Sequence, residues 1–246
     1  SGIDLTLAQT EDDATRLYEV GALNIHVVGN LKFDVALPVV AVDAGRAWRE
    51  HLSRPVIAIA STREGEDALF VQALAQQDST ALFLLIPRHP QRFDDAAALL
   101  ERAGIATVRW SELRHNPQAA QMLAGIKVVL CDTLGEMPFF YAASDVAIVA
   151  GSFVPVGGQN LIEALSCGKP VLVGPHTFNF KQVTADAITV GAAIRVPDAQ
   201  HVFSSVSQMD ATSNDYQAMS KVAIQFCVQH QGATARTLKL LSPQLK

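Results

Sequence analysis

The sequence predicts an α/β protein built on a Rossmann-like, doubly wound parallel sheet. Short runs rich in Val, Ile and Leu recur along the 246 residues, as is typical of strands that are covered on both faces. Segments with helical periodicity separate these runs, and such an alternation requires βαβ units. Polar, glycine-containing segments follow several of the runs, which is where ligand-binding loops lie in a sheet of this kind.

The first residues predict one strand and one helix. Ile3 to Gln9 alternate between apolar and polar side chains, Glu11 to Asp13 place negative charge at a helix N-terminus, and Gly21 is placed to end that helix. No strands precede this unit, so we expect a truncated chain, with Ser1-Gly2 as a cloning remnant. The segment Asn30–Pro38 is the best linker in the sequence.

The rest of the chain alternates strands and helices until two closing helices. Strands are expected at Ile25–Val28, Val56–Ala60, Ala81–Ile86, Ile105–Val108, Val128–Cys131, Val146–Val149, Val171–Val173 and Ala193–Val196. Helices are expected near Gly65–Gln76, Gln91–Ala103, Glu136–Ala143, Leu161–Ser166, Asn179–Thr189, Asn214–His230 and Thr234–Leu241.

The composition excludes several classes of protein. Apolar residues make up 49% and charged residues 17%, which favours a buried core over disorder. A net charge of −5 gives no electrostatic footprint for nucleic acid. No apolar run reaches the roughly 20 residues that cross a bilayer, so we expect a soluble chain without a membrane segment. The three cysteines suit a reducing compartment, and no Cys or His pair has the spacing of metal ligands, so we expect no metal.

Two polar segments follow the first two strands of the expected main domain. Ser61 and Thr62 precede a Gly at a strand-to-helix turn and could present N–H groups to an anion, or they could form an ordinary helix cap. Pro87-Arg88-His89-Pro90 places a cation at the binding edge of the sheet, and two prolines stiffen it. Arg88 suits a phosphate or carboxylate ligand, although a salt bridge to a neighbouring helix is the alternative.

Three later segments have similar chemistry. In Asp132–Met137, either the loop around Gly135 and Glu136 shapes a ligand pocket, or Asp132 or Thr133 caps the next helix. The segment Gly151–Glu163 is the richest in glycine.

In the segment Gly151–Glu163, the residues Gly157 and Gly158 allow close backbone approach to a phosphate, and Glu163 could accept hydrogen bonds from ribose hydroxyls. Asn160 and Glu163 also have the spacing of a capping box, which is the structural alternative. The fifth segment mixes His176, Asn179 and Lys181 in one loop, where we expect Phe178 and Phe180 to pack and hold the polar groups in place.

Taken together, these five segments resemble the 3-deoxy-manno-octulosonic acid (Kdo) transferases of lipopolysaccharide synthesis. The resemblance covers the chain from its first strand to its C-terminus and includes Gly29–Asp34, which matches the interdomain stretch of the family. It implies a GT-B architecture of two Rossmann-like domains. Residues 1–35 would then be the tail of a truncated N-terminal domain with the interdomain linker, and residues 36–246 the CMP-Kdo-binding domain.

The resemblance also implies a division of labour. This domain would bind CMP-Kdo, and the absent N-terminal domain would bind the lipid A precursor and supply the catalytic base, so no catalytic residue is expected here. No cofactor is implied, and the whole enzyme would act at the cytoplasmic face of the bacterial inner membrane. Gln159 stands where some relatives carry His. The residues expected to bind the donor are Ser61, Thr62, Arg88, His89, Gly135, Glu136, Gly157, Gly158, Asn160, Glu163, His176, Asn179 and Lys181.

Two other functions share parts of this pattern. Another GT-B enzyme, such as a UDP-sugar transferase or epimerase, has the same glycine-rich turn and the same Glu. A non-catalytic nucleotide-binding module is the third interpretation. Relative affinities for CMP, UMP and AMP distinguish a Kdo transferase from another GT-B enzyme.

Overall fold

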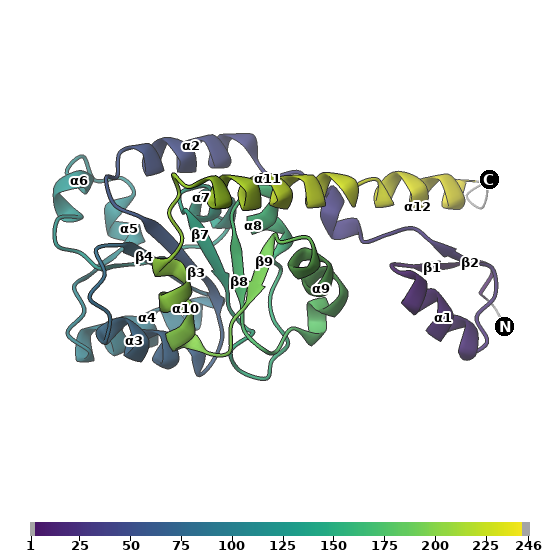
Figure 1. Ribbon diagram of the computed structural model, residues 1–246, viewed down its shortest axis with the longest axis horizontal. Coiled ribbons are helices and arrows are strands. Elements are labelled where there is room, and N and C mark those ends of the chain that lie inside the picture. The colour runs from purple at the N-terminus through teal and green to yellow at the C-terminus, as the bar shows by residue number, and fades with distance from the viewer. Residues whose placement is uncertain (1–2, 243–246) are drawn as a thin grey trace. The chain divides into compact units, whose positions relative to one another are not determined.

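The computed structural model describes residues 3–242, and their contacts divide them into two compact units. The first unit takes the chain up to Ala36 together with the stretch from Gln225 onward, and the second unit is Leu37–Ile224 (Figure 1). The boundary at Ala36 falls inside the predicted linker. The assignment of these units to the two domains of a GT-B enzyme stays a prediction.

The second unit contains a seven-stranded sheet in which every neighbouring pair of strands is parallel. The order of the strands is β5-β6-β4-β3-β7-β8-β9. They are β3 (Val56–Thr62), β4 (Leu82–Pro87), β5 (Thr107–Arg109), β6 (Val128–Leu130), β7 (Val146–Val149), β8 (Val171–Val173) and β9 (Ala193–Arg195). All seven lie within two residues of their predicted positions, and the predicted fold class is confirmed.

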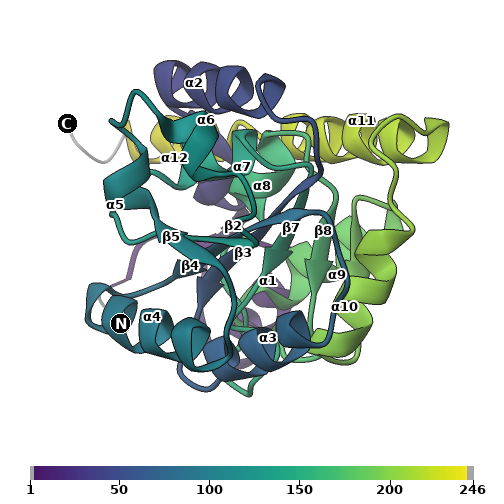
Figure 2. The same cartoon turned by 90° about the vertical axis from the view of Figure 1, so that its left-hand side faces the viewer.

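Helices cover both faces of this sheet (Figure 2). On one face lie α3 (Glu66–Ala75), α4 (Phe93–Arg102) and α10 (Ala199–Ser207), and on the other α2 (Val39–Glu50), α7 (Met137–Ala142) and α8 (Ile162–Ser166). Shorter or peripheral elements are η2 (Pro90–Arg92), α5 (Trp110–Leu113), α6 (Ala119–Met122), η3 (Phe178–Phe180) and α9 (Lys181–Thr189).

The core of the second unit lies between the sheet and its helices. The side chains from Val56 to Ala60 are fully buried, because the central strand β3 is covered on both faces. On one face, the ring of Phe83 meets that of Phe203 edge to face at 5.4 Å, which fixes α10 against β4. Since β4, β6, β7 and β8 are buried in the same way, the ends of these strands are rigid supports for the loops that follow them.

The first unit is built from both ends of the chain. Its strands β1 (Thr6–Ala8) and β2 (Ile25–Val27) form a parallel pair, joined by α1 (Glu11–Glu19). A 3₁₀ turn, η1 (Leu31–Asp34), then packs the buried ring of Phe33 against Phe226 and His230, at 5.7 and 4.9 Å between ring centroids. These partners belong to the last turns of α11 (Asn214–Gln229) and to the segment before α12 (Ala233–Leu241). The predicted linker therefore includes a packed turn.

Four α-helices were not predicted from the sequence: α2, α10 and the single-turn helices α5 and α6. The helix α2 starts with Val39 and Val40 after a proline and contains Gly45, all of which are poor helix formers. A Cβ atom at Gly45 would lie 2.4 Å from the carbonyl oxygen of Phe139 in α7. Glycine is therefore required for the close packing of α2 on α7, and tertiary contacts override the weak local propensity.

Candidate functional site

The order of the sheet reverses between β3 and β7. From β3 the chain continues to β4 on one side, and from β7 it continues to β8 and β9 on the other. Ligands of open α/β sheets bind beyond the carboxyl ends of the strands at such a switch point. The predicted segments Ser61–Glu66 and Gly151–Glu163 follow these two strands, so the topology brings them to one place.

The end of β3 is irregular at Ser61. Its φ is +61°, and the register with β4 shifts between Ala60 and Thr62, so Ser61 forms a bulge at the carboxyl edge. The neighbouring Thr62 is buried, and its hydroxyl donates to the carboxylate of Asp67, which is paired in turn with Arg92. Thr62 therefore faces the interior, whereas Ser61 stays half-buried at the edge.

The carboxylate of Glu66 connects the loop after β3 with the loop after β7. It is fully buried and accepts three backbone N–H bonds, from Arg63 at 2.8 Å, Gly151 at 2.6 Å and Phe153 at 2.8 Å. Burial raises the pKa of Glu66, and these three N–H groups oppose that shift because they favour the charged form. Two segments far apart in the sequence are thereby fixed to each other.

The loop after β4 carries a group of positive charges. The backbone N–H of Arg88 donates to the carbonyl of Thr62 at 3.0 Å, which places this loop beside the end of β3. Arg63 donates to Nε2 of His89 at 2.7 Å. Burial and the positive charges of Arg63, Arg88 and Arg92 lower the pKa of His89 from its ordinary value of 6.5, so the ring is neutral at pH 7. The exposed Arg88 side chain makes no ion pair within residues 3–242.

The glycine-rich loop is held by Asn179. The side chain of Asn179 donates to the carbonyl of Val156 at 3.0 Å, and its backbone N–H donates to that of Gly157 at 2.9 Å. Gly157 has a φ of +98°, and a Cβ atom there would lie 2.4 Å from the Asn179 amide nitrogen. Gly158 also has a positive φ, and its N–H donates to the carbonyl of Gly151. Asn179 thus positions the loop, which is a structural task.

Asn160 and Glu163 contact each other at the start of α8. The Asn160 amide donates to Glu163 Oε1 at 3.1 Å, and its carbonyl oxygen accepts from the N–H of Ile162. This differs from a capping box, in which Glu163 would bond the backbone of the N-cap residue. Burial raises the pKa of Tyr141. The negative charge of Glu163 raises this pKa further, and the positive charge of Arg88 lowers it. Glu163 and Arg88 are therefore both within electrostatic range of one phenol.

The loop after β6 is bound to a different part of the unit. Glu136 accepts from Trp110 Nε1 at 3.2 Å, from Arg114 at 3.3 Å and from the hydroxyl of Thr133. Gly135 beside it is exposed, with a φ of +79° and open space around its Cα. The carboxylate of Glu136 is thus engaged with the segment after β5 rather than with the loops at the switch point.

The loop after β8 joins the switch point through its backbone. The N–H of His176 donates to the carbonyl of Ser152 at 2.9 Å, and Arg195 donates to the carbonyls of Gly174 and Pro175 and to the hydroxyl of Thr177. His176 is half-buried and Lys181 is exposed. The expectation that Phe178 packs inside the loop is wrong, since its side chain is 61% exposed, although one edge of it lies over Gly157.

The structure thus brings four of the five predicted segments together by hydrogen bonds, and the segment of Gly135 and Glu136 bonds elsewhere. Three positions with supporting roles were not among the predicted site residues: Arg63, Glu66 and Arg195. In the sequence, an acidic residue in the first turn of a helix, such as Glu66, indicates only a favourable interaction with the helix dipole. Its burial beneath a loop 85 residues away leaves no local pattern.

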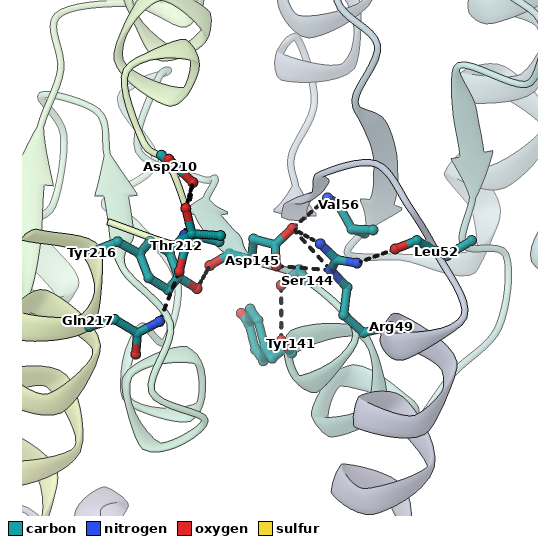
Figure 3. A network of polar contacts seen from close by, with 11 residues as sticks. Arg49, Leu52, Val56, Tyr141, Ser144, Asp145, Asp210, Thr212, Tyr216 and Gln217 are labelled. Atoms are coloured by element: carbon teal, nitrogen blue, oxygen red, sulfur yellow. Dashed lines mark hydrogen bonds and ion pairs between the residues drawn. The ribbon is translucent and has the colours of Figure 1, made fainter. Parts of the chain in front are cut away.

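A cavity of about 490 Å³ lies at the opposite edge of the sheet, and none of the thirteen predicted residues lines it. Arg49 and Asp145 in its wall form a bidentate ion pair at 2.9 and 2.8 Å, and Asp145 also accepts from the N–H of Val56 (Figure 3). Arg54 donates to two backbone carbonyls. Because these charged groups are already paired, the carboxyl edge is the better place for an anionic ligand.

Comparisons with known proteins identify relatives of the chain. No protein-family model matches the chain. The chain is 53% identical to a 3-deoxy-D-manno-octulosonic acid transferase of Bordetella pertussis and 30% identical to one of Haemophilus influenzae. Both matches cover 100% of this chain and 58% of the relative, so the chain spans less than two thirds of the length of these relatives. Within residues 3–242, no helix is both long and apolar enough to cross a membrane.

The chain is also similar to solved structures of glycosyltransferases. The crystal structure of the C-terminal CMP-Kdo binding domain of WaaA from Acinetobacter baumannii is 28% identical, with a TM-score of 0.69 over 77% of this chain and 98% of that chain. Anabaena HepE in complex with UDP and glucose is 15% identical, covers 98% of this chain and 63% of that chain with a TM-score of 0.58, and supports the fold alone. This chain is therefore homologous along its whole length to the Kdo transferases, the family of GT-B glycosyltransferases that its sequence motifs predicted.

Proposed function

We propose that this chain binds CMP-Kdo and is the donor domain of an enzyme that transfers Kdo to lipid IVA in lipopolysaccharide synthesis. The observation that supports this most is the convergence of cationic and N–H donors at the switch point of the sheet. Arg88 and the glycine-rich loop stand where the phosphate of a nucleotide would lie. The homologous C-terminal CMP-Kdo binding domain of WaaA supports cytosine as the base.

In the proposed reaction, an acceptor hydroxyl attacks the anomeric carbon of Kdo. The bond between that carbon and the phosphate oxygen breaks, CMP leaves with the electron pair, and the hydroxyl proton passes to a base. Arg88 and backbone N–H groups would stabilise the negative charge that develops on the phosphate. Glu163 would accept hydrogen bonds from the ribose hydroxyls.

The acceptor site and the base would come from the part of the enzyme outside this chain, because the chain spans only 58% of its relatives. We therefore expect this chain alone to bind the donor but not to transfer Kdo. Loss of a general base typically costs about 10²–10⁴-fold in rate, and loss of acceptor positioning adds to that. The whole enzyme would act at the cytoplasmic face of the inner membrane, where its lipid acceptor lies.

Calorimetric titration with CMP, UMP and AMP tests the donor. CMP should bind more tightly than the other two nucleotides. Equal or tighter binding of UMP would favour a UDP-sugar enzyme of the same fold, and absence of binding by all three would refute a donor domain. Incubation of the chain with CMP-Kdo and lipid IVA, followed by mass spectrometry, tests the division of labour: turnover near that of a full-length relative would place the catalytic groups within these residues.

A further inference from the structure

The buried carboxylate of Glu66 lies at the point where the sheet order reverses. It binds the loop after β3 through the N–H of Arg63 and the loop after β7 through the N–H groups of Gly151 and Phe153. Between the last two lies Ser152, which is itself buried. The backbone carbonyl of Ser152 accepts a hydrogen bond from the N–H of His176. The side-chain hydroxyl of Ser152 accepts one from the N–H of Gly174. One side chain thus reaches, directly or through Ser152, three of the loops that carry the predicted ligand contacts.

The geometry around Glu66 requires a carboxylate. An ionised carboxylate is an acceptor at both oxygens, so it can bond all three N–H groups at once. A carboxamide of the same size would direct its own N–H₂ group toward at least one of these N–H groups. That contact would be repulsive, and one loop would have to move away. A hydrocarbon side chain would leave three buried N–H groups without acceptors.

The residue is not needed for an ion pair. Within residues 3–242 no cation forms a salt bridge with Glu66, and the nearest charge that affects its titration is the carboxylate of Asp67. A buried negative charge beside another negative charge is unfavourable for stability alone. The carboxylate at this position therefore has a different use, which is to hold backbone groups of separate loops in one arrangement.

We propose that Glu66 is a positioning residue for the donor site, which holds the loop Arg63–Gly65 and the glycine-rich loop Gly151–Asn160 in the arrangement that binds the nucleotide phosphate. It does not touch the ligand. It fixes the backbone of the two loops that would surround the phosphate, so that these loops lose little freedom on binding. The inference rests on the proposed function, because nucleotide binding is its readout.

Glu66→Gln tests the proposal by calorimetry with CMP at a temperature where the variant is folded. The matched control is Asp145→Asn, which also removes a largely buried carboxylate that accepts a backbone N–H, but at the opposite edge of the sheet. We expect Glu66→Gln to bind CMP about tenfold to a hundredfold more weakly, and Asp145→Asn to bind it within about twofold of the unaltered chain. Equal affinity in both variants would overturn the proposal and leave Glu66 as a structural residue only.

A second measurement needs no variant, in case Glu66→Gln does not fold. Amide hydrogen exchange of the unaltered chain should slow at Gly151 and Phe153 when CMP is saturating, because ligand binding and the Glu66 contacts stabilise the same loop arrangement. Unchanged exchange at both amides would overturn the proposal. If the unaltered chain binds no CMP, the proposed function fails and this inference with it, whereas CMP binding that Glu66→Gln leaves intact refutes this inference alone.

Discussion

At the amino edge of the seven-stranded sheet, a largely buried carboxylate pairs with an arginine, whereas at the carboxyl edge a buried carboxylate binds only backbone N–H groups and an arginine stays exposed. Arg49 and Asp145 pair with each other at the amino edge, and Tyr216 closes this network through the carbonyl of Asp145 at 2.7 Å (Figure 3). At the carboxyl edge, Glu66 holds N–H groups of two loops, and Arg88 stays exposed. Under the proposed function, one edge of the sheet serves stability and the other serves binding.

The difference follows from what each edge has to do. At the amino edge, the starts of the strands only have to be held in place. An ion pair whose hydrogen bonds are all made, such as Arg49–Asp145, holds them without any ligand. Loops at the carboxyl edge must be rigid and yet keep donors available for a ligand, so their order comes from side chains underneath them. Glu66 and Asn179 both act on backbone from within or beside the loops they hold.

The largest effect should come from breaking the amino edge. Asp145→Asn leaves the guanidinium of Arg49 partly buried without its partner, and it disturbs the acceptor of the Val56 N–H. We expect the free energy of unfolding to fall by about 3 kcal/mol, which denaturant titration would measure. The control is Asp43→Asn, which breaks the exposed pair with Arg46 and should cost less than about 1 kcal/mol. Equal losses in the two variants would contradict a structural role specific to the amino edge.

Breaking the carboxyl edge should change binding and spare stability. Arg88→Ala removes an exposed cation that makes no ion pair in the described part of the chain, so the melting temperature should stay nearly the same. Charge-assisted bonds to a phosphate are worth about 1.5–3 kcal/mol, so CMP affinity should fall roughly tenfold to a hundredfold. Arg102→Ala, which removes an exposed charge at the end of α4, is the control for net charge. Identical CMP affinities for the two variants would remove Arg88 from the site.

The same comparison explains what could be predicted from the sequence. The inner strands of the main sheet are predictable because each is a buried apolar run, as at Val146–Val149, where predicted and observed bounds coincide. The loops that follow them are predictable because their glycines and cations are local. Helix α2 was missed because its Gly45 is set by contact with α7, and Glu66 was left out of the site because its partners lie 85 and 87 residues away. Long-range contacts of this kind leave no periodic signal.

Glu163→Gln distinguishes a ligand contact from a helix cap. Its partner Asn160 keeps an acceptor in the variant, so stability should change little. If Glu163 accepts from ribose hydroxyls, the loss of its charge should weaken CMP binding by roughly 1 kcal/mol, or about fivefold, and leave the binding of free cytosine unchanged. Calorimetry with both ligands and a thermal melt would measure this. A lower melting temperature with unaltered CMP affinity would assign Glu163 to the start of α8 instead.

The smallest effect, and the most local, concerns the protonation of His89. Burial and the charges of Arg63, Arg88 and Arg92 disfavour the imidazolium, so the pKa of His89 in the folded chain lies below its ordinary value of 6.5. The folded state then binds fewer protons than the unfolded state just below pH 6.5. The contribution of His89 to stability is therefore complete above that pH, and it is lost as the pH falls through the lower, folded pKa.

NMR titration of the His89 ring nitrogens should give a midpoint below 6.5 in the free chain. If a phosphate binds beside Arg88, its negative charge offsets the arginines, so saturating CMP should raise that midpoint. His201 is the internal control, because its ring bonds Asp198 at the exposed start of α10 and not a predicted site residue. Cytidine, which lacks the phosphate, should leave His89 unchanged. A midpoint that is the same with and without CMP would show that the phosphate does not lie beside the loop after β4, and Arg88 would lose its proposed role.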